Sequence, residues 1–192
     1  NGSTDYDTFK TKLGLDSDYM IRFNDPFSNL SNASLNKAAV VNTQIAIMKS
    51  IISELGSGSE SDVESTIATQ IITRTGDETS LGDTTWTKNA ITAISSSSDD
   101  FSPSSEQLVS LSAGISAFMQ KINANDSSKS HSHFAKAGMT ELKDLMKKVM
   151  EGTADSAEID KLTFNTIAWI NENTSWDGGT ITDNESELIT TT

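Results

Sequence analysis

The sequence NASLNKAAVVNTQIAIMKSIISEL, residues 32–55, decides the fold of this chain. Its apolar residues recur at alternating spacings of four and three, which is the period of an α-helix and not the alternation of a β-strand. The main stripe consists of Val41, Ile45, Met48, Ile52 and Leu55. A second group, Val40, Ile47 and Ile51, widens this stripe onto another face. We therefore expect a central helix that is buried on most of its sides.

Both ends of this helix carry sequence signals. Asn32 and Ser34 are residue types whose side-chain oxygens cap a helix N-terminus, and either one can serve here. After Leu55 comes the run Gly56–Ser59, whose glycines and serines favour a chain reversal over a further helical turn. The pattern predicts that the helix ends at this run.

The same helical spacing recurs along most of the remaining chain. It predicts further helices over residues 5–15, 63–76, 83–94, 102–122, 139–152 and 156–170. We expect an all-α fold, an irregular or up-down bundle of about six to seven helices joined by short polar loops. Trp86 and Trp169 lie on apolar helix faces and are expected in the core. Residues 1–176 are predicted to form a single helical domain, with 177–192 as a tail or linker to a following domain.

The composition excludes several classes of function. The chain has 27 acidic and 14 basic residues, a net charge of −13, which opposes binding to nucleic acid. It contains no cysteine, so disulfides, thiol catalysis, Fe–S clusters and cysteine-ligated zinc are excluded. No apolar run approaches the length of a membrane span. With only 6% aromatic residues, the core must be built mainly from aliphatic side chains and methionine.

An acidic stretch between the first two predicted helices is the best candidate for a metal site. Its oxygen-bearing residues are Asp16, Asp18, Asn24 and Asp25. Calcium binds six to eight oxygen ligands in a flexible geometry, so calcium is the cofactor that this stretch predicts. The order of residues is not that of an EF-hand loop, which needs alternating acids, a central glycine and a terminal glutamate. The alternative is that these residues only cap turns and face water.

Aromatic residues near this stretch and near the C-terminus are candidates for partner binding. They are Tyr19, Phe23, Phe27 and Trp176. Exposed aromatic rings can contact a neighbouring protein domain or a carbohydrate, and Trp176 stands beside a predicted turn. The alternative is that the three aromatic residues of the acidic stretch pack their own loop onto the bundle.

Three short segments together resemble a known type of module. They are Leu13–Leu15, Phe23–Phe27 and Asn42–Gln44, within residues 9–55. This arrangement is similar to helical modules of large secreted bacterial surface or adhesin-type proteins, which often stand beside calcium-binding repeats of the thrombospondin type 3 or dockerin-like kind. The calcium repeat itself, with its alternating aspartates and glycine, is absent from this sequence. The resemblance implies an exported, multidomain protein at the cell surface.

These observations favour a non-enzymatic extracellular module of a bacterial surface protein. It would act in adhesion or as a structural spacer, with calcium as a stabilising ion and with neighbouring domains or another surface protein as partners. One alternative is an extracellular or periplasmic ligand-binding or sensor domain with an apolar pocket. A second alternative is a polysaccharide or peptidoglycan hydrolase, which needs two carboxylates across a cleft, one with a raised pKa.

Overall fold

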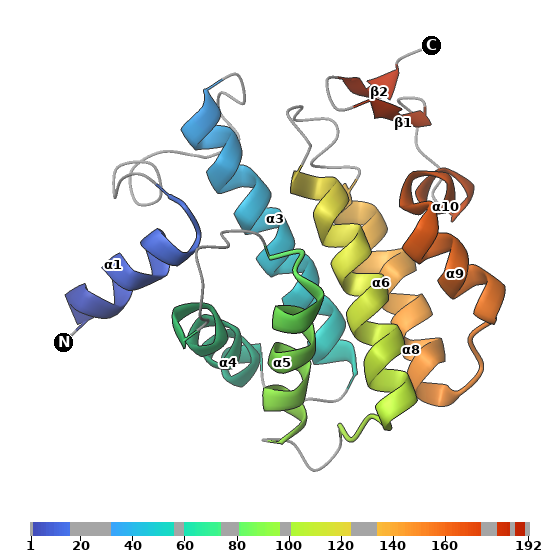
Figure 1. Cartoon of the computed structure of the whole chain (residues 1–192), viewed down its shortest axis with the longest axis horizontal. Coiled ribbons are helices and arrows are strands. Elements are labelled where there is room, and N and C mark those ends of the chain that lie inside the picture. The colour runs from blue at the N-terminus through green and yellow to red at the C-terminus, as the bar shows by residue number, and fades with distance from the viewer. Residues whose placement is uncertain are drawn as a thin grey trace.

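The computed structural model describes residues 2–15, 32–55, 60–73, 81–96, 101–123, 134–173, 180–184 and 187–190. Within these ranges the chain is a bundle of eight α-helices and one π-helical turn, followed by a short hairpin (Figure 1). The helices are α1 (Gly2–Lys12), α3 (Ala33–Glu54), α4 (Glu60–Thr73), α5 (Thr84–Ser95), α6 (Ser105–Asn123), the π turn η1 (Gly138–Leu142), α8 (Lys143–Glu151), α9 (Ser156–Phe164) and α10 (Thr166–Asn173). The hairpin pairs β1 (Thr180–Asn184) with β2 (Glu187–Thr190) in antiparallel fashion. The predicted all-α fold class is confirmed.

Helix α3 occupies the centre of the bundle, as the sequence predicts. It contacts α4, α6, η1 and α8, and in Figure 1 it runs through the middle of the molecule. Asn32 is its N-cap, and its side-chain Oδ1 accepts hydrogen bonds from the backbone amides of Ser34 and Leu35 at 3.0 and 3.1 Å. Val41, Met48 and Ile52 of the apolar stripe and all three residues of its widened flank are buried. Ile45 and Leu55 are partly buried and pack against the core, so α3 contributes to the core on most of its sides.

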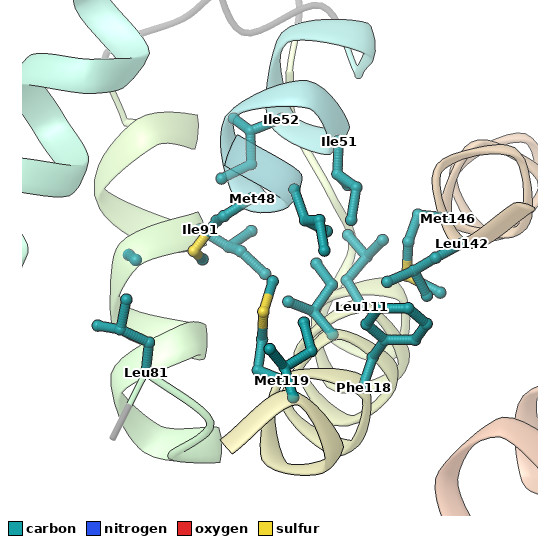
Figure 2. Packing of buried hydrophobic residues seen from close by; sticks show 14 of the residues in the cluster. Met48, Ile51, Ile52, Leu81, Ile91, Leu111, Phe118, Met119, Leu142 and Met146 are labelled. Carbon is teal, nitrogen blue, oxygen red and sulfur yellow. The ribbon is translucent and has the colours of Figure 1, made fainter. Parts of the chain in front are cut away.

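The core is aliphatic and rich in methionine. Figure 2 shows Met48, Ile51 and Ile52 of α3 among side chains from three other parts of the chain. These neighbours are Leu81 and Ile91 from the α5 region, Leu111, Phe118 and Met119 from α6, and Leu142 and Met146 from η1 and α8. The Phe118 ring also meets the Trp169 ring edge to face at 6.5 Å, so α10 joins the same core. Trp86 and Trp169 are both buried, as predicted.

A buried side-chain amide links the two longest helices. The Nε2 of Gln44 on α3 donates a hydrogen bond to the Met119 carbonyl oxygen on α6, at 2.9 Å. Gln44 is only 1% exposed, and burying an amide without a partner would be unfavourable by about 1–3 kcal/mol. The bond therefore fixes the position of α3 against α6 as well as satisfying the amide.

Helix α6 begins with a capping box that also holds α8. The Ser104 hydroxyl oxygen accepts from the Gln107 amide at 3.2 Å, and Gln107 Oε1 accepts from the Ser104 amide at 2.7 Å. The Gln107 Nε2 then donates to the carbonyl oxygen of Met150, near the end of α8, at 2.7 Å. One side chain thus caps one helix and secures the last turn of another.

The structure differs from the predicted elements in three places. The helix expected over 156–170 is broken at Asn165 into α9 and α10, which raises the number of helices above the expected six to seven. The helix expected from Met139 already begins at Phe134 and contains the π turn. Within the predicted tail, 180–184 and 187–190 form the hairpin, and β1 contacts α10.

Candidate functional site

All residues that the sequence predicts as metal-binding or partner-binding lie outside the described residues. They are Asp16, Asp18, Tyr19, Phe23, Asn24, Asp25, Phe27 and Trp176. The calcium site and the aromatic contact site therefore stay predictions. In the part of the chain that the structure describes, no three histidine, aspartate or glutamate side chains are grouped so that they could hold a metal ion.

The described residues do contain a groove on the outer face of α3, beside the π turn. Its volume is about 260 Å³, and its lining residues are Ala46, Lys49, Ser50, Ser53 and Met139. The α3 residues recur at helical spacing, so they share one face. Because most of these side chains are small, this face of α3 forms a shallow floor. Met139 of η1 is 40% exposed and stands at the edge of the groove.

A close contact between backbone and side chain positions the wall of this groove. A Cβ atom on Gly138 would lie only 2.6 Å from Cδ1 of Ile47, so only glycine fits at this position without a shift. The π turn can therefore lie directly against α3. π-Helical turns are rare and are found frequently at functional sites. Sequence reasoning missed this groove, although a glycine inside an apolar helical pattern is the signal of a close backbone approach.

Two sets of ion pairs flank the groove. Lys49 Nζ lies 2.6 Å from Glu64 Oε1 and links α3 to α4. On the other side, Glu54 of α3 pairs with Lys143 Nζ at 3.6 Å and with Lys147 Nζ at 3.2 Å on α8. These side chains are partly exposed, so each pair contributes little to stability. Together they connect the groove floor to the helices on both sides.

Glu54, Lys143 and Lys147 form the Glu54 cluster, and their interactions shift the pKa values of Glu54 and Lys147. The hydrogen bond from Lys147, together with the positive charge of Lys143, holds the pKa of Glu54 below its ordinary value of 4.5. The same hydrogen bond raises the pKa of Lys147 above 10.5. A general acid in a hydrolase needs a carboxyl group whose pKa is raised, so the shift of Glu54 is in the opposite direction. Glu54 is a member of a structural ion-pair cluster.

Ser53 adds a polar atom that has no hydrogen-bond partner. Its Oγ atom is enclosed, and no hydrogen bond to it is formed within the structure. Serines inside helices usually turn the hydroxyl to the carbonyl oxygen one turn earlier, as Thr43 does with Ala39 at 2.9 Å. Ser53 instead lines the groove with its hydrogen-bonding capacity unused.

The other surface features of the described residues are less developed. Among the described residues, a hollow of about 330 Å³ is lined by Asp7, Thr8, Thr11 and Lys12, which all belong to α1, so no second described element faces it. Phe164 at the end of α9 is 87% exposed, and Val109 on α6 is 57% exposed. Single exposed apolar side chains are normal on protein surfaces. The groove on α3 is therefore the best candidate site among the described residues.

The groove offers a thioether, hydroxyl groups and an ammonium group, which suit contact with another molecule through apolar packing, hydrogen bonds and charge. Its volume of about 260 Å³ is below the roughly 300–1,000 Å³ that small-molecule sites occupy. Among the described helices, none combines the length and hydropathy needed to cross a membrane. No protein family, curated protein or solved structure matches this chain.

Proposed function

We propose that this chain is a non-enzymatic module of an extracellular bacterial surface protein and that it acts as a structural spacer. One observation carries this proposal: α1 and the β1–β2 hairpin lie on opposite sides of the bundle (Figure 1). A polypeptide that enters through α1 and leaves through the hairpin must cross the whole bundle. A bundle of fixed shape then sets the distance between whatever is joined to its two sides.

The packing of the end elements supports this role. Leu13, which directly follows α1, is fully buried in the same core cluster as Ile170 of α10. Helix α1 contacts α4, and β1 contacts α10 at the other side of the bundle. Because the end elements contact helices of the bundle, a force applied to them is transmitted to the bundle rather than to a loose linker.

The proposed setting rests on the sequence. The acidic composition, with a net charge of −13, keeps a secreted module soluble and opposes self-association. The resemblance of residues 9–55 to modules of bacterial surface proteins supplies the extracellular, multidomain context. Calcium is the ion that the acidic stretch with Asp16 and Asp25 is expected to bind in that setting.

Adhesion is the second candidate function, and the groove on α3 favours it. A partly exposed methionine beside small side chains and lysines resembles a contact face more than an enclosed pocket. A spacer can also carry such a face, so the two functions are compatible. The ligand-binding alternative would require an enclosed apolar cavity, whereas this groove is shallow and small.

Single-molecule energy transfer tests the spacer. Because the chain has no cysteine, Asp7→Cys and Thr180→Cys introduce the only two labelling sites, one on α1 and one on β1. We expect one narrow distance distribution in buffer. A flexible chain of the same length would give a broad distribution with a root-mean-square distance of about 70 Å, which the denatured labelled protein provides as a control. A broad or multi-peaked distribution in buffer would exclude a spacer of fixed length.

A further inference from the structure

We infer that Met139 is a modification site, at which a peroxide oxidises the thioether to a sulfoxide while the bundle stays folded. This inference goes beyond the spacer function, because a spacer needs no reactive side chain. It rests on the unequal exposure of the methionines, on the place of Met139 in the π turn and on the polar character of the groove beside it.

Exposure divides the methionines of the described residues into separate groups. Met139 is 40% exposed, whereas Met48, Met119 and Met146 are 2%, 1% and 0% exposed. Figure 2 shows these three buried methionines among the aliphatic side chains of the core. Met150 is intermediate, since it is partly buried and packs against the core. A dissolved oxidant must touch the sulfur atom to react with it, so the fold exposes Met139 to attack and shields the core methionines.

The oxidation needs only the thioether and a peroxide. A lone pair of the sulfur attacks one oxygen of hydrogen peroxide, so an S–O bond forms and the O–O bond breaks. The sulfur loses two electrons, and the peroxide is reduced. The oxygen that stays on sulfur gives its proton to the departing hydroxide, which becomes water. The product is methionine sulfoxide, a polar side chain in place of an apolar one.

The fold is built so that this change is tolerated at Met139. Its side chain is not part of the core cluster, and the π turn is held against α3 by the neighbouring contact of Gly138 with Ile47. The sulfoxide oxygen accepts hydrogen bonds, and at Met139 it stays in reach of water beside a groove lined mostly by polar residues. A sulfoxide at Met48 would instead place a polar group among apolar side chains, which is unfavourable without a partner.

Oxidation of Met139 changes the character of the groove. Met139 is the largest apolar side chain that lines it, and Ala46 is the other apolar one. After oxidation the edge of the groove is polar, so an adhesive contact made through the thioether is weakened by peroxide. Neither the spacer nor the adhesive role is needed for the modification itself, so each can fail without the other.

Timed oxidation with hydrogen peroxide tests the inference. The protein carries Met20→Leu, which removes the methionine outside the described residues, and peptide mass spectrometry follows each remaining methionine. In buffer, we expect the sulfoxide to form about tenfold or more faster at Met139 than at Met48, Met119 or Met146. In urea the four rates should become similar, because unfolding exposes every sulfur. Similar rates in buffer, or slower reaction at Met139, would overturn the inference.

Two variants and a stability measurement complete the test. Met139→Leu should abolish the fast reaction, whereas Met150→Leu on α8 removes a partly buried methionine and should retain it. Circular dichroism verifies that both variants are folded. Wild type in which only Met139 is oxidised should melt at the same temperature as the reduced protein. A loss of helical signal on oxidation that Met139→Leu prevents would show that the bundle does not tolerate the sulfoxide, and would overturn the inference.

Discussion

Gly138 lies so close to Ile47 that a single added carbon at Gly138 would come within 2.6 Å of the Ile47 side chain. This contact joins the π turn to the central helix α3. The helical stripe of residues 134–151 is not a regular α-helix throughout, because the π turn Gly138–Leu142 interrupts it. The π turn gives this stretch the local geometry in which Gly138 meets α3 while Leu142 and Met146 still reach the core.

The Gly138–Ile47 contact predicts a strong coupling between the two positions. Gly138→Ala should destabilise the protein by about 1–3 kcal/mol, because the added methyl group overpacks the contact. Ile47→Ala alone should also destabilise it, by about 2–5 kcal/mol, since it leaves a cavity. The double variant should be more stable than the sum of both effects predicts, as chemical denaturation of the four proteins would show. Strictly additive effects would contradict the contact.

The capping box of α6 predicts a second local loss of stability. Gln107→Ala removes the reciprocal bond with Ser104 and the bond to the Met150 carbonyl oxygen. We expect a loss of about 1–2 kcal/mol and a melting temperature lower by several degrees. Glu106→Ala changes the neighbouring exposed residue and is the matched control. Equal melting temperatures for the two variants would show that Gln107 does not hold α6 and α8.

The Glu54 cluster predicts a pH dependence of known sign. Because the folded protein lowers the pKa of Glu54 below 4.5, the unfolded chain binds more protons near that pH, and acid reduces stability. Wild type should therefore exceed Glu54→Gln in stability above pH 4.5 and lose this advantage as the pH falls through the lowered pKa. The difference should be small, because these groups are exposed. Urea denaturation over this pH range measures it, and Glu106→Gln matches the change in charge. A difference that grows on acidification would contradict the ion pairs.

Calcium should stabilise the folded chain if the acidic stretch binds it. An ion that binds only the folded state adds about 2.7 kcal/mol at a hundredfold excess over its dissociation constant. Thermal unfolding with calcium and with a chelator measures the effect, which Asp16→Ala or Asp25→Ala should abolish. Magnesium is the control, since it prefers a smaller and more rigid octahedral site. Identical melting curves with calcium and chelator would remove calcium from the proposed function.

Much of the fold follows from the sequence because local signals and packing agree. Asn32 caps α3, and the Asp83 side chain accepts a hydrogen bond from the Trp86 amide at 2.6 Å and caps α5, as residue type and position indicate. The helical stripes predict the burial of Met48, Ile52 and Trp169, and each is buried. These features depend on spacing along one helix, which a sequence displays directly.

The remaining features depend on contacts between distant residues. The break at Asn165 is an exception, because it depends on a local cap: Asn165 Oδ1 accepts from the Ala168 amide at 3.3 Å at the start of α10, within an apolar stripe that continues across the break. The groove does depend on such contacts, because Met139 lies 86 positions from Ser53 and the packing of η1 and α8 against α3, including Gly138 on Ile47, brings the two residues together. The sites that the sequence does predict, such as the Asp16–Phe27 stretch, lie outside the described residues.

A spacer requires the bundle to behave as a single mechanical body, and two tryptophans report on this. Trp86 lies on α5 and Trp169 on α10, and both are buried. In a Trp176→Phe background, two variants are made. Trp169→Phe leaves Trp86 on α5 as the only tryptophan, and Trp86→Phe leaves Trp169 on α10 as the only tryptophan. We expect the urea unfolding curves of the two proteins, each compared with circular dichroism of the same sample, to coincide. If fluorescence of either probe changes at a different urea concentration from the helical signal, the bundle is not one cooperative unit and cannot be a spacer of fixed length.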